Sequence, residues 1–331
     1  SGFSFEARIN RGAGAFVCGE STALFTSIEG KPGNPRPKYV RSVEEGLWGR
    51  PTVLNNVETF ANVPLIIERG SEWYSGLGVT HSTGTKVFSL VGKVNNVGLV
   101  EVPMGVTLAR IVEEIGGGVP GGRPFKAVQT GGPSGGCLPH ALKDTPVDFD
   151  SLTAAGSMMG SGAMIVMDDT DCVVDVGRYF LRFLEEESCG KCLPCRLGLT
   201  RMREILDDFS KGVGSEKDIE DLTSLARAVQ DGALCALGSS APNPVLTTLR
   251  YFKTEYLSHV QDQKCPAGVC KDLITYSIDS GLCTGCGTCL RQCPAGCITG
   301  GKKEPHVIDA SQCLRCGLCK ETCKFDAVII A

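Results

Sequence analysis

The sequence predicts an α+β protein of several domains, from three observations. The chain has 331 residues, enough for two or three domains. Its apolar pattern changes along the chain, from short runs between glycines and prolines, to strand-like alternation, to helical spacing. Its eighteen cysteines are concentrated in tight groups in the second half. We expect a partial glycine-rich α/β domain over residues 1–80, a β-grasp-like module over 81–175 and a helical bundle over 176–255. A linker over 256–275 and a small cysteine-rich module over 276–331 are expected to follow.

Composition excludes several classes of function. The net charge is −4 and the lysines and arginines are scattered, so we expect no nucleic-acid partner. No run approaches eighteen consecutive apolar residues, so we expect no membrane span. The cysteines could form disulfides, but that use is typical of short secreted chains, and no secretory signal is visible. A reducing cytoplasm, in an anaerobic bacterium, is the expected location.

The first segment combines glycine loops with short helices. Residues 1–9 alternate apolar and polar side chains, like a strand whose beginning is absent, and they include no initiator methionine. We therefore expect that an N-terminal part is missing. Residues 11–21 form a glycine loop, and a helix is predicted from Ser21. The turn-rich stretch 30–37 follows. Asn55 and Asn56 precede a second predicted helix, which runs through Ile66 and Ile67.

The second segment alternates strands with one helix. Strands are predicted over residues 86–92, 98–102 and 126–130. An amphipathic helix is predicted over 106–115, ended by Gly116. Two strands, a helix and another strand indicate a β-grasp-like module.

The third segment has apolar residues at helical spacing throughout. Ser215 with Asp218 resembles a capping box at the start of one helix. Residues 276–331 are too few for a large core, so bound clusters must supply much of the stability there.

Two cysteine runs near the C-terminus share the spacing C-x2-C-x2-C-x3-C, which is typical of thiolates that hold [4Fe–4S] cubanes. In two-cluster ferredoxins the fourth cysteine of each run ligates the other cluster. The expected ligand sets are therefore Cys283, Cys286, Cys289 and Cys323 for one cubane, and Cys313, Cys316, Cys319 and Cys293 for the other. A zinc module is the alternative, since thiolates also bind zinc.

Neighbouring residues fit this interpretation. Glycines such as Gly285 and Gly317 let backbone amides approach inorganic sulfide. Lys324 stands where the ferredoxin pattern usually has proline, and its charge could raise the potential of that cluster. Cys297 is extra to both runs, and as a small buried hydrophobe it needs no function.

A further triplet lies upstream, with one distant cysteine. Its members are Cys189, Cys192, Cys195 and Cys235. With the glycine loop, the Pro51-to-Pro64 segment and the β-grasp-like module in the same order, it resembles the family of flavin subunits found in respiratory complex I and in NAD-linked hydrogenases and formate dehydrogenases. The resemblance covers residues 1 to about 250. It implies an oxidoreductase with a third [4Fe–4S] cluster, an FMN/NAD(P)-binding domain ending near residue 80, and an SLBB-like β-grasp module.

The resemblance also implies which residues lie near the flavin. They are Phe16, Gly19, Glu20, Ser21, Asn55 and Asn56. Glycines admit a planar ring and its phosphate close to backbone amides, and asparagine amides can hydrogen-bond ring edges or phosphate. Turn formation before a helix is the alternative role for Asn55 and Asn56.

The sequence departs from the family pattern in three places. Ser21 replaces a second acidic residue that is thought to disfavour NADP, so the choice between NAD(H) and NADP(H) stays open. Phe16 replaces a frequent tyrosine and lacks its hydroxyl. The upstream glycine-rich FMN loop of the family is not present in these residues.

The linker contains a possible zinc hinge. Its candidate ligands are His259, Cys265 and Cys270, with Cys297, Cys172 or a partner chain as the fourth. Two free thiols and a surface imidazole are the alternative. Cys18 beside the glycine loop could be redox-active, although a buried structural thiol is the simpler interpretation.

The C-terminal module favours one branch of the family. Flavin subunits of multimeric [FeFe] hydrogenases often continue through a Cys-Pro-Ala-Gly-x-Cys linker, matched by Cys265 to Cys270, into a two-cluster module. The resemblance therefore implies an electron-bifurcating hydrogenase subunit. Its expected partners are a catalytic subunit, a thioredoxin-like [2Fe–2S] subunit and ferredoxin. A flavin subunit of formate dehydrogenase or another NADH dehydrogenase, and a non-catalytic electron-transfer scaffold, are the alternatives.

Overall fold

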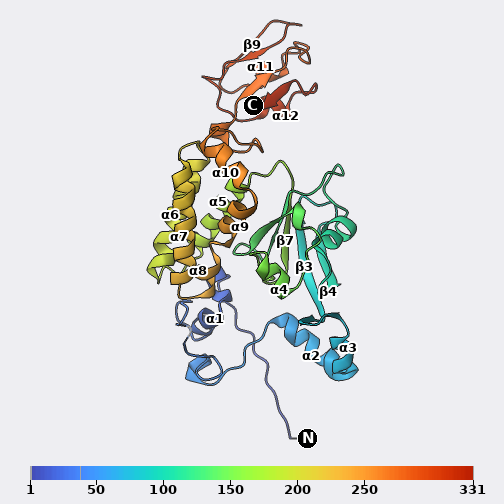
Figure 1. The fold of residues 1–331 in the computed structure, drawn as a ribbon, viewed down its shortest axis with the longest axis vertical. Helices are drawn as coiled ribbons and strands as arrows, with labels where there is room; N and C mark the ends of the chain where they lie inside the picture. The colour runs from blue at the N-terminus through green and yellow to red at the C-terminus, as the bar shows by residue number, and fades with distance from the viewer. Residues whose placement is uncertain (1, 38, 331) are drawn as a thin grey trace. The chain divides into compact units, whose positions relative to one another are not determined.

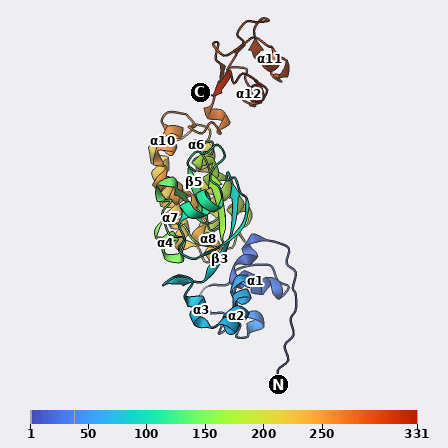
Figure 2. The same cartoon turned by 90° about the vertical axis from the view of Figure 1, so that its right-hand side faces the viewer.

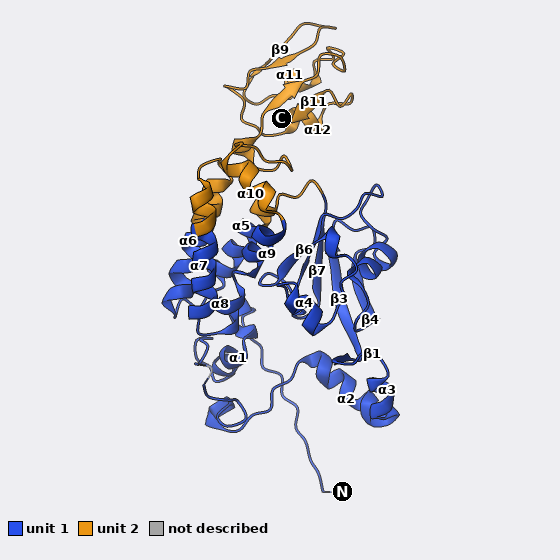
Figure 3. Cartoon of the chain, viewed as in Figure 1, with its two compact units in different colours: residues 1–168, 177–203, 221–251 blue, residues 169–176, 204–220, 252–331 orange. Residues whose placement is uncertain are grey.

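The computed structural model describes residues 2–37 and 39–330, and Figure 1 shows the order of their helices and strands. They group into two compact units, coloured separately in Figure 3. The first comprises residues 1–168, 177–203 and 221–251, and the second comprises 169–176, 204–220 and 252–331. Within the described part of the chain, no helix combines the length and apolar character needed to cross a membrane.

The N-terminal segment is built from short elements. The 3-10 turn η1 (Phe16–Gly19) leads into α1 (Ser21–Ile28), which confirms the helix predicted from Ser21. The strand predicted over residues 1–9 is wrong: Ser1 lies outside the described residues, and residues 2–9 form neither strand nor helix. Phe3, Phe5 and Ile9 are exposed, and an extended segment becomes a strand only when a neighbour takes its backbone hydrogen bonds.

The loop after α1 is organised around one carboxylate, that of Glu29. Lys31, the backbone N–H of Trp48 and Arg36 all donate to it, and together they lower the pKa of Glu29 to about 2. This loop contains η2 (Leu47–Gly49). The helices α2 (Val57–Arg69) and α3 (Ser71–Ser75) follow, and α2 confirms the helix predicted through Ile66 and Ile67.

A mixed sheet forms the centre of the first unit. A small hairpin, β1 (Gly78–Val79) with β2 (Ser82–Thr83), precedes it. The sheet contains β3 (Thr85–Gly92), β4 (Gly98–Pro103), β5 (Ala127–Thr130), β6 (Gly136–Pro139) and β7 (Ala163–Met167). Its order is β4-β3-β7-β5-β6, with β3 and β7 parallel and the other pairs antiparallel. Figure 2 shows the sheet from a second side.

Helical segments pack on this sheet and close its core. The π-helical turn η3 (Arg110–Ile115) and α4 (Phe149–Ala154), with the residues beside them, contribute Leu108, Ile111 and Leu152 to a cluster that also holds Phe88 and Leu90 of β3. The helix predicted over 106–115 ends at Gly116 as expected but begins late. Val106 and Thr107 pair instead with residues 145–147, which holds them extended.

Six α-helices lie between the sheet and the C-terminal module. They are α5 (Val173–Glu186), α6 (Leu193–Phe209), α7 (Glu216–Gly232), α8 (Ala236–Ser240), α9 (Asn243–Tyr251) and α10 (Lys253–Val260). The predicted capping pair is confirmed at the start of α7, where the Ser215 backbone N–H and hydroxyl both donate to the Asp218 carboxylate, at 2.8 and 2.7 Å. In the first unit, α9 packs on the edge strand β6, where the Thr247 hydroxyl accepts from the Cys137 backbone N–H.

The C-terminal module is a repeat of two similar halves after η5 (Lys271–Leu273). Its elements are β8 (Tyr276–Ile278), α11 (Thr288–Gln292), β9 (Ile298–Thr299), β10 (Val307–Ile308), α12 (Leu318–Glu321) and β11 (Val328–Ile330). β8 pairs with β11 and β9 pairs with β10, both antiparallel. Each short helix begins after a left-handed glycine, Gly287 (φ 72°) or Gly317 (φ 81°), which lets the chain turn sharply behind a cysteine.

Candidate functional site

The upstream cysteines converge at the ends of three helices. Cys189 and Cys192 lie in the loop between α5 and α6, Cys195 lies in the first turn of α6, and Cys235 directly precedes α8. The other three thiols are all electrostatic neighbours of Cys195. The structure therefore brings together the four residues expected to hold the upstream cluster.

The surroundings of these sulfurs fit an iron–sulfur cluster. Burial raises the pKa of the Cys195 thiol to about 11, against the opposing effect of a hydrogen bond with the Ser188 hydroxyl at 3.2 Å. A metal that stabilises the thiolates would remove this cost of burying charge. The Cys235 sulfur accepts from the backbone N–H groups of Leu237 and Gly238. Such donors stabilise cluster thiolates.

The glycine loop is fastened to this cysteine loop. The Phe16 backbone N–H donates to the Glu187 carboxylate at 2.7 Å, and Glu187 lies two residues before Cys189. The Phe16 ring packs edge-on against Phe183 of α5, with centroids 5.2 Å apart. The Lys191 ammonium donates to the Pro35 carbonyl at 3.4 Å. The predicted flavin loop and the predicted cluster therefore share one site.

Within the glycine loop, the acidic residue has a structural task. The Glu20 carboxylate caps α1 by accepting from the backbone N–H groups of Thr22 and Ala23 at 2.9 and 3.0 Å, and from the Thr22 hydroxyl at 2.6 Å. Gly19 and Ser21 on either side are exposed. A planar ring or a phosphate can therefore reach the backbone here without displacing a side chain.

Asn55 and Asn56, which the resemblance places near the flavin, lie outside the glycine loop. Both are exposed, and Asn56 occupies the N-cap position of α2 without a side-chain capping bond. Asn56 lines a cavity together with Glu58 and Lys86, which form an ion pair. The contacts that join the glycine loop to the cysteine loop do not involve Asn55 or Asn56.

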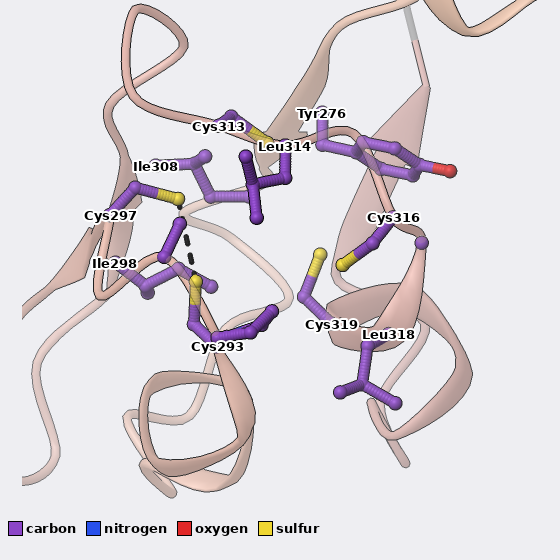
Figure 4. Close-up of a pocket in the computed structure, with 13 residues that line it drawn as sticks. Tyr276, Cys293, Cys297, Ile298, Ile308, Cys313, Leu314, Cys316, Leu318 and Cys319 are labelled. Atoms are coloured by element: carbon purple, nitrogen blue, oxygen red, sulfur yellow. Dashed lines mark hydrogen bonds between the residues drawn. The ribbon is translucent and has the colours of Figure 1, made fainter.

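The C-terminal module has two hollows, each lined by four cysteines expected to ligate one cubane. Cys283, Cys286, Cys289 and Cys323 line the first hollow. Cys313, Cys316, Cys319 and Cys293 line the second, shown in Figure 4. Each hollow thus takes three cysteines from one run and the last from the other, as in two-cluster ferredoxins.

Different side chains complete the two hollows. His306 lines the first, and its backbone N–H donates to the Cys283 sulfur at 3.5 Å. Tyr276 lines the second. These residues occupy matching positions in the repeat, because each lies seven residues before the first cysteine of a run.

A fourth group of ligand-type side chains lies in the second unit. Cys172, His259, Cys265 and Cys270 are all buried, and their ligand atoms lie within 4.8 Å of one another. The His259 Nε2 is 3.3 Å from the Cys172 sulfur and 3.4 Å from the Cys270 sulfur, and these two sulfurs are 3.8 Å apart. Tetrahedral zinc with Zn–S bonds of ~2.3 Å has sulfur–sulfur edges of ~3.8 Å.

Neighbouring groups orient these ligands. With its proton on Nδ1, His259 donates to the Glu255 carbonyl at 2.6 Å, which leaves Nε2 directed at the sulfurs. The Cys265 sulfur accepts from the backbone N–H groups of Val269 and Cys270. Hydrogen bonds from the neighbouring thiols lower the pKa of Cys265. Of the three candidates for the fourth position, the structure places Cys172 there, while Cys297 lies beside Cys293.

Two of the remaining cysteines pack against neighbouring residues. Burial raises the pKa of the Cys137 thiol to about 12, and its S–H donates to Gln129 at 2.8 Å. The Cys18 sulfur packs against Gly33 so closely that a Cβ there would lie 2.3 Å from it. These contacts give both Cys137 and Cys18 a structural role in packing.

Three family models match the chain. Residues 3–65 match the Nuo51 FMN-binding domain, and residues 175–259 match the NADH-ubiquinone oxidoreductase-F iron-sulfur binding region. Residues 282–327 match the 4Fe-4S dicluster domain. The predicted fold class, with an FMN-binding part, a helical iron–sulfur part and a ferredoxin-like module, is therefore confirmed.

Individual proteins match over most of the chain. The NADP-reducing hydrogenase subunit HndC of Solidesulfovibrio fructosivorans is 55% identical over 99% of this chain and 67% of its own length. An NADH-quinone oxidoreductase subunit of Rhizobium meliloti is 44% identical over 80% of this chain and 63% of its own. A crystal structure of NAD+-reducing [NiFe]-hydrogenase matches with a TM-score of 0.69 and 36% identity, over 76% of this chain and 42% of that one. The chain thus spans only part of its relatives.

Proposed function

Because the chain belongs to the family of complex I flavin subunits and their hydrogenase counterparts, as its matches to HndC and to the NADH-quinone oxidoreductase of Rhizobium meliloti show, we propose that it passes electrons between a nicotinamide nucleotide, FMN and three [4Fe–4S] clusters. The observation that supports this most strongly is the hydrogen bond from Phe16 to Glu187, which joins the flavin loop to the loop of Cys189.

The residues of the core have separate tasks in this proposal. Bound FMN would accept a hydride from the nucleotide and release its electrons singly. The exposed residues Gly19 and Ser21 offer room for the flavin, and Glu20 holds the start of α1 in place. Glu187 and Phe183 keep the glycine loop next to the thiols that would hold the first acceptor cluster.

We further propose that the complete protein belongs to a cytoplasmic, electron-bifurcating [FeFe] hydrogenase. The two-cluster module supports this, because it offers a second set of one-electron carriers. The relative HndC is named as a hydrogenase subunit that reduces NADP. The proposed partners are a catalytic subunit, a thioredoxin-like [2Fe–2S] subunit and ferredoxin. A formate dehydrogenase subunit and a scaffold without flavin remain the alternatives.

The assay that tests this proposal supplies the intact complex with NADH, NADPH and ferredoxin, singly and in pairs. Bifurcation predicts hydrogen turnover only when a nucleotide and ferredoxin are present together. Full turnover with a nucleotide alone would contradict bifurcation but leave the flavin role intact. Formate-dependent reduction of the nucleotide would instead identify the alternative enzyme.

A second proposal concerns Cys172, His259, Cys265 and Cys270: we propose that they bind structural zinc. Four buried ligands with tetrahedral spacing are typical of a closed structural site, which keeps no position for substrate. The site would tie the residues before α5 to α10 and to the chain that enters the ferredoxin-like module.

A further inference from the structure

A fifth cysteine lies at the second hollow of the C-terminal module. Cys297 is 3% exposed and lines that hollow together with the four proposed ligands. Its sulfur is 3.4 Å from the Cys293 sulfur, the contact drawn as a dashed line in Figure 4. This is far longer than a disulfide bond of ~2.05 Å, so the two sulfurs are not bonded to each other.

Local backbone structure holds Cys297 in this position. The Gly296 N–H donates to the Cys293 carbonyl at 3.2 Å, and Gly296 takes the left-handed conformation (φ 61°), so the chain turns back towards the hollow. The Asp309 N–H donates to the Cys297 carbonyl at 2.8 Å. Cys313 is a second hydrogen-bonding neighbour of the Cys297 sulfur. The thiol is therefore held between two proposed ligands by a fixed turn.

The internal repeat supplies a matched comparison. In the first half, Cys297 lies four residues after Cys293; in the second half, Ala327 lies four residues after Cys323. Ala327 is also buried and lines the first hollow. The preceding residue, Asp326, is left-handed (φ 48°), as Gly296 is in the first half. One cluster site has a thiol where the other has only a methyl group.

We propose that Cys297 is a non-ligating thiol that donates a hydrogen bond to the Cys293 thiolate and raises the reduction potential of the cluster in the second hollow. Reduction adds negative charge to a cluster, and a hydrogen bond to a ligand sulfur stabilises that charge. The inference rests on the proposed binding of two cubanes in this module.

The test is a redox titration of the complete subunit, with EPR of the reduced clusters and iron analysis. Cys297→Ala should leave iron unchanged and lower the midpoint of one cluster, by about a tenfold change in the one-electron equilibrium constant, or ~59 mV. Cys297→Ser keeps a donor and should restore the wild-type midpoint. Ala327→Cys should raise the midpoint of the other cluster.

Three outcomes would overturn the inference. Unchanged midpoints in Cys297→Ala would show that the thiol does not act on the cluster, and equal shifts of both clusters would indicate a general structural effect. Loss of iron in Cys297→Ala would make Cys297 a ligand. Failure of the underlying proposal looks different, because the wild-type module would then lack the iron of two cubanes.

Discussion

Ser21 is the residue that we expect to bear most directly on the choice between NADH and NADPH. It occupies the first position of α1 and is exposed. Its neighbour Glu20 is committed to capping the same helix through three hydrogen bonds. A second carboxylate at position 21 would be free to repel the 2′-phosphate of NADP, whereas a hydroxyl can donate to it.

Ser21→Glu should therefore reduce kcat/KM for NADPH relative to NADH by about tenfold or more. Like charges ~4 Å apart repel by ~1 kcal/mol in water and ~4 kcal/mol near a protein surface. A carboxylate in the first turn favours the helix dipole, so the variant should fold. Steady-state kinetics with both nucleotides measure the ratio, with Ser27→Glu on the same helix as control. An unchanged ratio would show that position 21 does not face the phosphate.

Among the helices and strands, periodicity in the sequence correctly predicted the elements that interact mainly with residues close to them in the chain. The helix from Ser21, the helix through Ile66 and the capping pair Ser215 and Asp218 are all present. The elements that were wrong or late depend on distant partners: residues 2–9 have the strand alternation without a pairing strand, and Val106 is held extended by residues 145–147.

The candidate sites show the same difference between residues close together and residues far apart in the chain. The short spacing of the cysteines predicted which cysteines line both hollows. Three of the four proposed ligands in each hollow come from a single C-x2-C-x2-C run. Cys172 was only one of three candidates for the fourth zinc ligand, since 87 residues separate it from His259. The contact of Cys297 with Cys293 was missed, although the repeat, with Ala327 at the matching position, offered the signal.

The proposed zinc site gives a prediction for these elements. Cys172→Ser should reduce zinc from one per chain to near zero, because serine is a poor zinc ligand, while iron stays unchanged. Metal analysis of the purified protein measures both. Cys137→Ser is the matched control, as Cys137 is equally buried but hydrogen-bonds Gln129. Full zinc in Cys172→Ser, or equal losses in both variants, would refute the site.

In the whole molecule, the twelve proposed cluster ligands divide between two proposed electron-transfer tasks. Cys189, Cys192, Cys195 and Cys235 lie beside the flavin loop in the first unit. The eight proposed ligands of the C-terminal module lie in the second unit, which also contains the four proposed zinc ligands. The proposed nucleotide-linked chemistry and the proposed ferredoxin-like carriers therefore belong to different compact units.

In the proposed function, one polypeptide converts the electron pair of a nucleotide into single electrons on clusters. An anaerobic titration of the complete protein with NADH and with NADPH, monitored by flavin absorbance and cluster EPR, tests this proposal. We expect the flavin band to bleach and the signal of at least one reduced cluster to appear as nucleotide is added. Bleaching by neither nucleotide, in a protein shown to contain flavin and roughly twelve irons for three cubanes, would contradict it.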